Sequence, residues 1–222
     1  TEGTSDPEEA ERILSEELKA AKPVEIVRRF PEEPREAGQS KIVQHLEVSE
    51  PTFYFGYKIF PEQEPAALLK QQVVLDILLD VLAGPTSAFY EEMNRQGLLD
   101  DNFGTEVFGE RGCLAAFFGG DSKDPEAVYN AFCEMIEQRK AEGLSEEEFL
   151  SCKNAMYGKL LKGLGDVENT ATAMLSYEMM GLGMFEAAET VAAVQLSDLE
   201  KCLRDCFDPS CRAISIVLPL EE

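Results

Sequence analysis

The amino-acid sequence predicts an α+β fold in which helices pack on a largely antiparallel sheet. Segments with strand periodicity come in clusters, whereas segments with helical periodicity follow one another in the second half of the chain. This segregation is typical of layered α+β domains. With 222 residues, of which 44% are hydrophobic, the chain is long enough for one large domain or two small ones.

The stretch 71–101 is the centre of the predicted fold. Nearly every residue between Val73 and Leu82 is apolar, so we expect a helix that is buried on most of its circumference. Gly84 should end this helix, and a second helix runs from about Ser87 to Arg95 before Gly97. The only polar stripe of the first helix consists of Gln72, Asp76 and Asp80.

An acidic helix is predicted at the start of the chain. Asp6 suits the N-cap, Pro7 the first helical position, and Glu9 can complete a capping box. This helix should run to about Ala21, but its apolar stripe is weak. We therefore interpret residues 1–23 as an acidic linker or docking helix and residues 24–222 as a single domain.

Three strands are expected before the buried helix, over residues 24–30, 41–48 and 52–60. The second and third alternate apolar and polar side chains as half-buried strands do. In the second strand the apolar face consists of Ile42, Leu46 and Val48. Because the segment Ser49-Glu50-Pro51 is short, we expect these two strands to form a hairpin.

A second hairpin and a series of helices are predicted after Gly97. The hairpin joins strands over 102–108 and 112–118. Ser145 with Glu148, and Ser197 with Glu200, have the spacing of capping boxes. The predicted helices cover about 125–143, 146–164, 166–182, 185–194 and 197–206, and a last strand covers 212–218.

The charge of the chain restricts its partners. The formal net charge of −23 argues against nucleic-acid and anionic-membrane partners, because phosphate surfaces would repel it. The same negative charge weakly favours basic peptides as binding partners. No run reaches the ~20 apolar residues of a membrane span, and no signal-peptide pattern is present, so we expect a soluble, cytoplasmic protein. The chain begins at Thr1, which is consistent with a processed chain or an excised segment.

Residues with catalytic or metal-binding chemistry are scarce. His45 is the only histidine, so a His-x-x-Glu-His zinc site is excluded within this chain. We interpret His45 as a solvent-facing strand residue, although an autonomous enzyme that uses it as a base is an alternative. The six cysteines are interpreted as reduced core residues. Three of them could form a metal cluster, but their spacing matches no standard zinc module: Cys202, Cys206 and Cys211.

A group of flexible apolar residues lies in the late helices. We interpret them as core filling, and an adaptable peptide-binding surface stays open as the alternative. They are Met174, Tyr177, Met179, Met180, Met184 and Phe185.

Several segments, in a fixed order, carry a family resemblance that covers nearly everything after Val24. They are Arg29-Phe30-Pro31-Glu32-Glu33-Pro34, Gly56-Tyr57, Val73–Leu82 with Gly84-Pro85-Thr86-Ser87 and Tyr90, Gly97-Leu98-Leu99-Asp100, Gly119-Gly120-Asp121-Ser122-Lys123-Asp124-Pro125, and Ile214-Ser215-Ile216-Val217-Leu218-Pro219. The chain resembles the C-terminal domain of pitrilysin/insulinase-type zinc peptidases, in the smaller processing-peptidase-like branch whose chains consist of two homologous domains. It is most similar to a bacterial subgroup in which a peptidase-like protein works beside a paralogue and is named for association with elongation-factor modification.

The resemblance implies a two-layer α/β roll with helices on one face of the sheet. It places the zinc in a homologous N-terminal domain, so no cofactor is expected in this chain. In catalytic members the C-terminal domain supplies an arginine and, a few residues on, a tyrosine that contact substrate. This chain has Asn94 and Asp100 in those places, with Arg95 as a neighbour. We therefore predict no catalytic residue and take these three as candidate substrate contacts.

The resemblance leads to one main functional hypothesis. The chain would be a non-catalytic C-terminal domain of a zinc-dependent peptidase, forming part of the substrate chamber and an interface. Its partners would be the homologous N-terminal domain or a paralogous subunit, together with a peptide or protein substrate, and the isolated domain would form a homodimer. The alternative is a free-standing acidic binding or assembly protein without peptidase activity.

Overall fold

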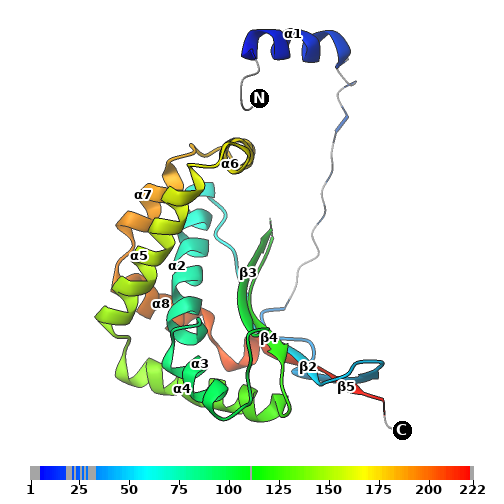
Figure 1. Ribbon diagram of the computed structural model, residues 1–222, viewed down its shortest axis with the longest axis vertical. Coiled ribbons are helices and arrows are strands. Elements are labelled where there is room, and N and C mark those ends of the chain that lie inside the picture. The colour runs from blue at the N-terminus through cyan, green and yellow to red at the C-terminus, as the bar shows by residue number, and fades with distance from the viewer. Residues whose placement is uncertain are drawn as a thin grey trace.

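A computed structural model describes residues 6–18, 22, 24, 25, 27, 29, 34–110 and 112–220. Apart from helix α1, they form two layers, a five-stranded sheet and a group of helices on one of its faces (Figure 1). The strands are β1 (Lys41–Leu46), β2 (Thr52–Ile59), β3 (Gly104–Glu110), β4 (Cys113–Asp121) and β5 (Arg212–Pro219). The helices are α1 (Pro7–Glu17), α2 (Pro65–Ala83), α3 (Ala88–Arg95), α4 (Pro125–Glu142), α5 (Glu146–Gly163), α6 (Val167–Met180), α7 (Glu186–Ala193), α8 (Leu196–Cys206) and the short 3₁₀ turn η1 (Pro209–Cys211).

The sheet is mixed but mostly antiparallel. Its strand order is β1-β5-β2-β4-β3. The pairs β2–β4, β2–β5 and β3–β4 are antiparallel, and β1 runs parallel to β5. The predicted α+β class, the antiparallel character of the sheet and the β3–β4 hairpin are therefore confirmed.

The predicted hairpin between the strands at 41–48 and 52–60 is wrong. β5 lies between β1 and β2, so the two strands are adjacent in sequence but not in the sheet. The expected burial of β1 is wrong as well, because all six of its residues are exposed. An edge strand contacts one neighbour only, and its side chains therefore lose less surface to solvent than those of a central strand.

The strand predicted over residues 24–30 falls mostly outside the regular structure. Val24, Glu25, Val27 and Arg29 belong to no strand, and residues 26, 28 and 30 lie outside the described residues. In the described chain two strands, not three, precede α2.

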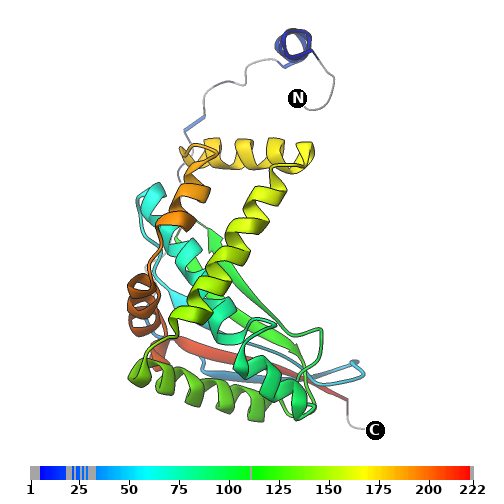
Figure 2. The same ribbon diagram turned by 60° about the vertical axis from the view of Figure 1, so that its left-hand side comes forward.

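Helix α2 is buried on most of its surface, as its sequence predicts. Ten of its nineteen residues are buried, and the helix contacts β3, α5, α7 and α8. A helix that is apolar around most of its circumference is stable in water only when it is covered on most sides. α2 is therefore the centre of the helical layer (Figure 2).

An aromatic cluster joins the helical layer to the sheet. The rings of Phe55 on β2 and Phe118 on β4 lie 5.1 Å apart between centroids, and Phe132 of α4 packs on both at 4.9 Å and 4.3 Å. All three side chains are fully buried. Such ring pairs add about 0.5–1.5 kcal/mol each beyond the area that they bury.

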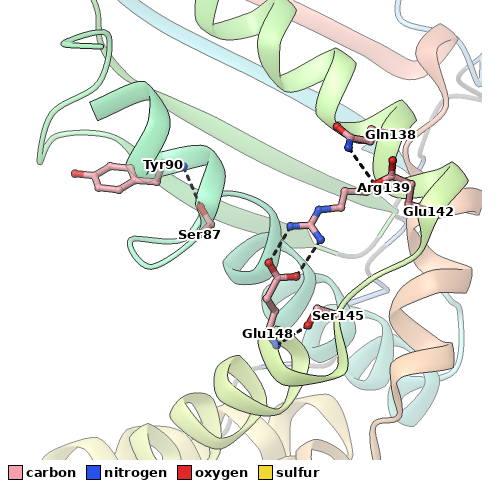
Figure 3. Close-up of polar contacts among 7 residues, drawn as sticks. All are labelled: Ser87, Tyr90, Gln138, Arg139, Glu142, Ser145 and Glu148. Carbon is pink, nitrogen blue, oxygen red and sulfur yellow. Dashed lines mark hydrogen bonds and ion pairs between the residues drawn. The ribbon is translucent and has the colours of Figure 1, made fainter. Parts of the chain in front are cut away.

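Most predicted helix starts are confirmed by their caps. The Ser87 hydroxyl accepts a hydrogen bond from the Tyr90 N–H at 3.1 Å (Figure 3). The Ser145 hydroxyl accepts one from the Glu148 N–H at 3.4 Å. Gly97 follows α3 with a φ of 70°, a left-handed conformation that glycine adopts without steric strain.

Three details of the predicted helix ends are corrected. The Glu148 carboxylate binds the Arg139 guanidinium at 2.9 and 3.0 Å instead of completing a capping box (Figure 3). Helix α8 begins at Leu196, where Asp198 accepts a hydrogen bond from the Gln195 N–H at 2.9 Å, so the cap is two residues earlier than predicted. Helix α1 ends at Glu17, because the Leu18 backbone is extended.

The polar stripe of α2 includes a carboxyl group with unusual acidity. Burial, together with the nearby charge of Asp80, raises the pKa of Asp76 from its ordinary value of 3.8 to about 6, and Lys159 on α5 acts in the opposite direction. Burial also raises the pKa of Asp80. Desolvation disfavours the charged form of a carboxyl group, so the folded state holds the Asp76 proton more tightly than the unfolded chain.

The burial of α2 predicts a large effect for a truncation in its centre. Leu78→Ala removes a fully buried side chain, and we expect it to lower the free energy of unfolding by about 2–5 kcal/mol. Leu161→Ala on α5 is the matched control, since 49% of this side chain is exposed and its loss should cost less than about 0.5 kcal/mol. Urea denaturation followed by circular dichroism measures both, and equal losses would contradict the assignment of α2 as the core.

The acidity of Asp76 predicts a pH-dependent stability. Its folded pKa of about 6 exceeds the ordinary value of 3.8, so the stability that it contributes is present below about pH 4 and is lost as the pH rises through about 6. Asp76→Asn should therefore be more stable than the parent by roughly 1–3 kcal/mol at pH 7, with no gain at pH 3.5. Urea titrations at both pH values test this, with the exposed Asp205→Asn as control; an equal gain at both pH values would contradict it.

Candidate functional site

The three predicted substrate-contact residues lie together at the end of α3, and all three make local polar contacts. Asn94 donates a hydrogen bond from Nδ2 to the Leu99 carbonyl at 3.1 Å. Asp100 accepts one at Oδ1 from the Asn102 N–H at 2.9 Å. Arg95 is exposed and forms an ion pair with Glu92 at 2.6 Å. The first two residues shape the turn that follows α3, and a role in substrate contact stays a prediction for all three.

His45 lies on the exposed edge strand β1, as predicted. Its Nδ1 is 3.1 Å from the Pro219 carbonyl oxygen. A histidine that acts as a base must reach a nucleophile at about 2.6–3.2 Å, and here its hydrogen-bond partner in the described chain is a backbone carbonyl. This geometry does not support an autonomous enzyme built on His45.

Three cysteines line a cavity of about 550 Å³ beside α8. A hydrogen bond between Cys202 and Cys206 raises the pKa of the first thiol and lowers that of the second. None of the six cysteines forms a disulfide. Cys202 and Cys211 are buried, as expected for core cysteines. Cys113 is exposed, so the expectation is wrong for this residue. Among the described residues no group of three potential ligands could hold a metal ion, which argues against the cluster.

A second cavity, of about 570 Å³, is bounded by α2, α5, α6 and α7. We call it the α6 groove. Its apolar lining includes Val107, Met156, Leu160, Leu161, Leu164, Tyr177, Met180, Met184, Phe185 and Val191. Its polar lining is small and includes Gln72, Asp76, Lys159 and Asn169. Its volume lies within the range of about 300–1,000 Å³ that is typical of ligand sites.

The interpretation of the α6 methionines as core residues is wrong. Helix α6 has no buried residue, and Met174, Met179, Met180 and Phe185 are all exposed, Met179 to 77%. The neighbouring Leu175 is 62% exposed. Side chains of this size gathered on one exposed helix are typical of an interaction surface, which was the alternative left open by the sequence.

The ion pair between Arg139 and Glu148 contributes to the position of the groove. It links the last turn of α4 to the first turn of α5 (Figure 3), and both side chains are half-buried. Leu144 and Phe149 pack into the core beside it. The ion pair and these two apolar side chains fix the direction of α5 relative to α4. Helix α5 in turn forms one wall of the α6 groove.

None of the helices in the described part of the chain has both the length and the apolar character needed to cross a bilayer.

The fold is shared with solved bacterial proteins. A proposed M16-like peptidase from Alicyclobacillus acidocaldarius matches 97% of this chain with a TM-score of 0.89 and 22% identity. A protease from Helicobacter pylori matches 98% of it with a TM-score of 0.82 and 16% identity. This chain covers 52% and 54% of those two proteins. At these identities the likeness shows the fold.

Sequence comparisons give the family. An uncharacterized zinc protease of Bacillus subtilis, YmfH, is 25% identical over 138 residues, which are 62% of this chain and 32% of YmfH. This chain therefore spans about a third of its curated relative and about half of its structural ones. The family model of the peptidase M16 inactive domain matches residues 3–156, and the predicted resemblance is confirmed at the level of the family. The chain belongs to the peptidase M16 family, as one of its inactive domains.

Proposed function

We propose that this chain is the non-catalytic C-terminal half of a zinc-dependent peptidase, where it forms part of the substrate chamber and packs against a homologous metal-bearing domain or a paralogous subunit. The observation that carries the proposal is the face of the sheet turned away from the helices. No described element covers it (Figure 1). A two-layer domain that leaves an apolar sheet face open buries it in a further contact.

This face, here called the open sheet face, carries exposed aromatic rings. Tyr54 is 58% exposed and Phe108 is 45% exposed. The Tyr54 ring lies over Gly119, and the Phe117 ring lies over Gly56, where a Cβ would come within 2.7 Å of it. These glycines let the rings lie flat on the sheet. Apolar neighbours on the same face are Ile42, Leu46 and Val217.

Helix α1 is a further candidate for contact with a companion domain. It lies apart from the rest of the described chain in both views (Figures 1 and 2), with Ile13, Leu14 and Leu18 exposed. Isolated helices shorter than about 12–15 residues are marginal in water. An α1 of 11 residues would therefore gain stability from docking, in keeping with residues 1–23 as a linker or docking helix and 24–222 as the domain proper.

The potential zinc ligands of this chain are few, which supports placing the zinc in a companion domain. Tetrahedral catalytic sites use three protein ligands, mostly histidine and carboxylate. The sequence offers the single His45, and the described residues contain no suitable cluster. In the proposed peptidase the companion domain holds the zinc and performs the hydrolysis, and Asn94, Arg95 and Asp100 would border the chamber.

The alternative is a free-standing acidic binding protein, which the net charge of −23 favours. The reading frame upstream of Thr1 distinguishes the two. An upstream domain with His-x-x-Glu-His would support the peptidase, whereas a start codon directly before Thr1 would contradict it. We further propose a cytoplasmic location, in keeping with six unpaired cysteines, which cell fractionation tests.

The proposed location of the zinc in a companion domain predicts that this chain binds no zinc tightly. After purification with zinc and dialysis, elemental analysis should find far less than one zinc per chain, because the described residues contain no cluster of three potential ligands. His45→Ala should leave this content unchanged. One tightly bound zinc per chain would overturn the assignment of the metal to a companion domain.

The open sheet face predicts self-association of the isolated chain. Without its companion, the face should pair with a second copy, since apolar patches avoid water. Sedimentation velocity over a range of concentrations should show a dimer, and Tyr54→Lys with Phe108→Lys should shift it to a monomer. Met174→Lys on α6 is the control, an exposed apolar residue of the other layer. A monomer at every concentration, or equal effects of the two variants, would count against this interface.

A further inference from the structure

The α6 groove combines apolar walls with a floor that carries the carboxylate of Asp76 and the amine of Lys159. Its walls are supplied by methionines, leucines and two aromatic rings from α5, α6 and the segment before α7. Met180 and Phe185 are both exposed and line it. Methionine side chains adapt to differently shaped partners because they are unbranched and polarizable. Walls of this kind accept the apolar face of a peptide helix.

The floor of the groove carries a carboxylate without an ion-pair partner. Asp76 lines the groove, and Asp80 lies one turn further along the same helix. Within residues 34–110 and 112–220 neither carboxylate has an ion pair within 4.0 Å, although Lys159 is close enough to lower the pKa of both. A half-buried carboxylate in an apolar groove attracts a cation more strongly than an exposed one does, because the local dielectric constant is lower.

We propose that the α6 groove binds an amphipathic basic peptide, with the apolar face of the peptide against Met180, Tyr177 and Phe185 and a lysine or arginine directed at Asp76. The occupant is a segment of a partner or substrate protein. The overall charge of −23 attracts such a peptide over long distances. This binding needs no zinc and no companion domain, so it goes beyond the proposed role in a peptidase and is testable separately.

Helix α1 of the same chain is the obvious competitor, and its charges argue against it. Its apolar stripe of Ile13, Leu14 and Leu18 would fit the walls. However, α1 carries five glutamates and one arginine, and it would bring carboxylates toward Asp76 and Asp80. Like charges at short distance disfavour a complex, whereas a basic helix would bring opposite charges toward these two carboxylates.

A synthetic peptide provides the direct test. A labelled leucine–lysine helix of about 14 residues, four turns, is titrated with the full chain at pH 7.5 and followed by fluorescence polarisation. Its uncharged leucine–glutamine analogue and a peptide with the sequence of residues 6–18 serve as comparisons. The basic peptide should bind about tenfold more tightly than either. Equal or tighter binding of the neutral peptide or of the α1 peptide would overturn the proposal.

Variants locate the site. Asp76→Asn should weaken binding of the basic peptide about tenfold, while Glu134→Gln, which removes an exposed charge on α4, should leave it unchanged. Met180→Gln, which makes the groove wall polar without adding charge, should also weaken binding about tenfold, and circular dichroism verifies that each variant is folded. If Asp76→Asn and Glu134→Gln have the same effect, the peptide binds by general charge attraction and the proposed site is wrong.

The pH dependence gives an independent readout. The titratable groups around Asp76 are Asp80 on α2, Lys159 on α5 and Tyr177 on α6, and Asp76 itself, with a pKa of about 6, changes charge between pH 5 and 7.5. Affinity for the basic peptide should therefore fall as the pH drops from 7.5 to 5, and this fall should shrink in Asp76→Asn. A fall of the same size in both proteins would exclude Asp76 as the contact.

Discussion

The burial of α2 is the constraint on which the rest of the structure depends. Ten of its residues leave water when the domain folds, and no single neighbour could cover them. α5, α7, α8 and β3 each take one side of the helix. α5, α7 and α8 are therefore held around α2 and on one face of the sheet. The other face stays uncovered, so the open sheet face follows from the same packing.

Local features of this fold could be predicted from sequence, and non-local ones could not. Helix periodicity and capping residues such as Ser87 and Ser145 placed most helices within a few residues, because those signals act within one turn. The pairing of β1 depended on β5, which lies far along the chain. A five-residue connection between β1 and β2 fits a hairpin equally well, and nothing in it reveals that another strand intervenes.

The two candidate sites also differ in how far the sequence predicted them. Asn94 and Asp100 were singled out by the family resemblance, but their hydrogen bonds to the Leu99 carbonyl and the Asn102 N–H required coordinates. The α6 groove was missed because exposed and buried methionines look alike in a sequence. A signal was nevertheless present: the two carboxylates of the α2 stripe interrupt a helix that is otherwise apolar, and Asp76 lines the groove.

The position of β5 has a consequence for how the domain is made. β5 hydrogen-bonds to both β1 and β2, so residues 41–59 have no neighbour on one side until residues 212–219 have left the ribosome. Contacts of such high sequence separation form late and fold slowly. During synthesis, the exposed edges of β1 and β2 are therefore open to wrong strand pairing until β5 is available.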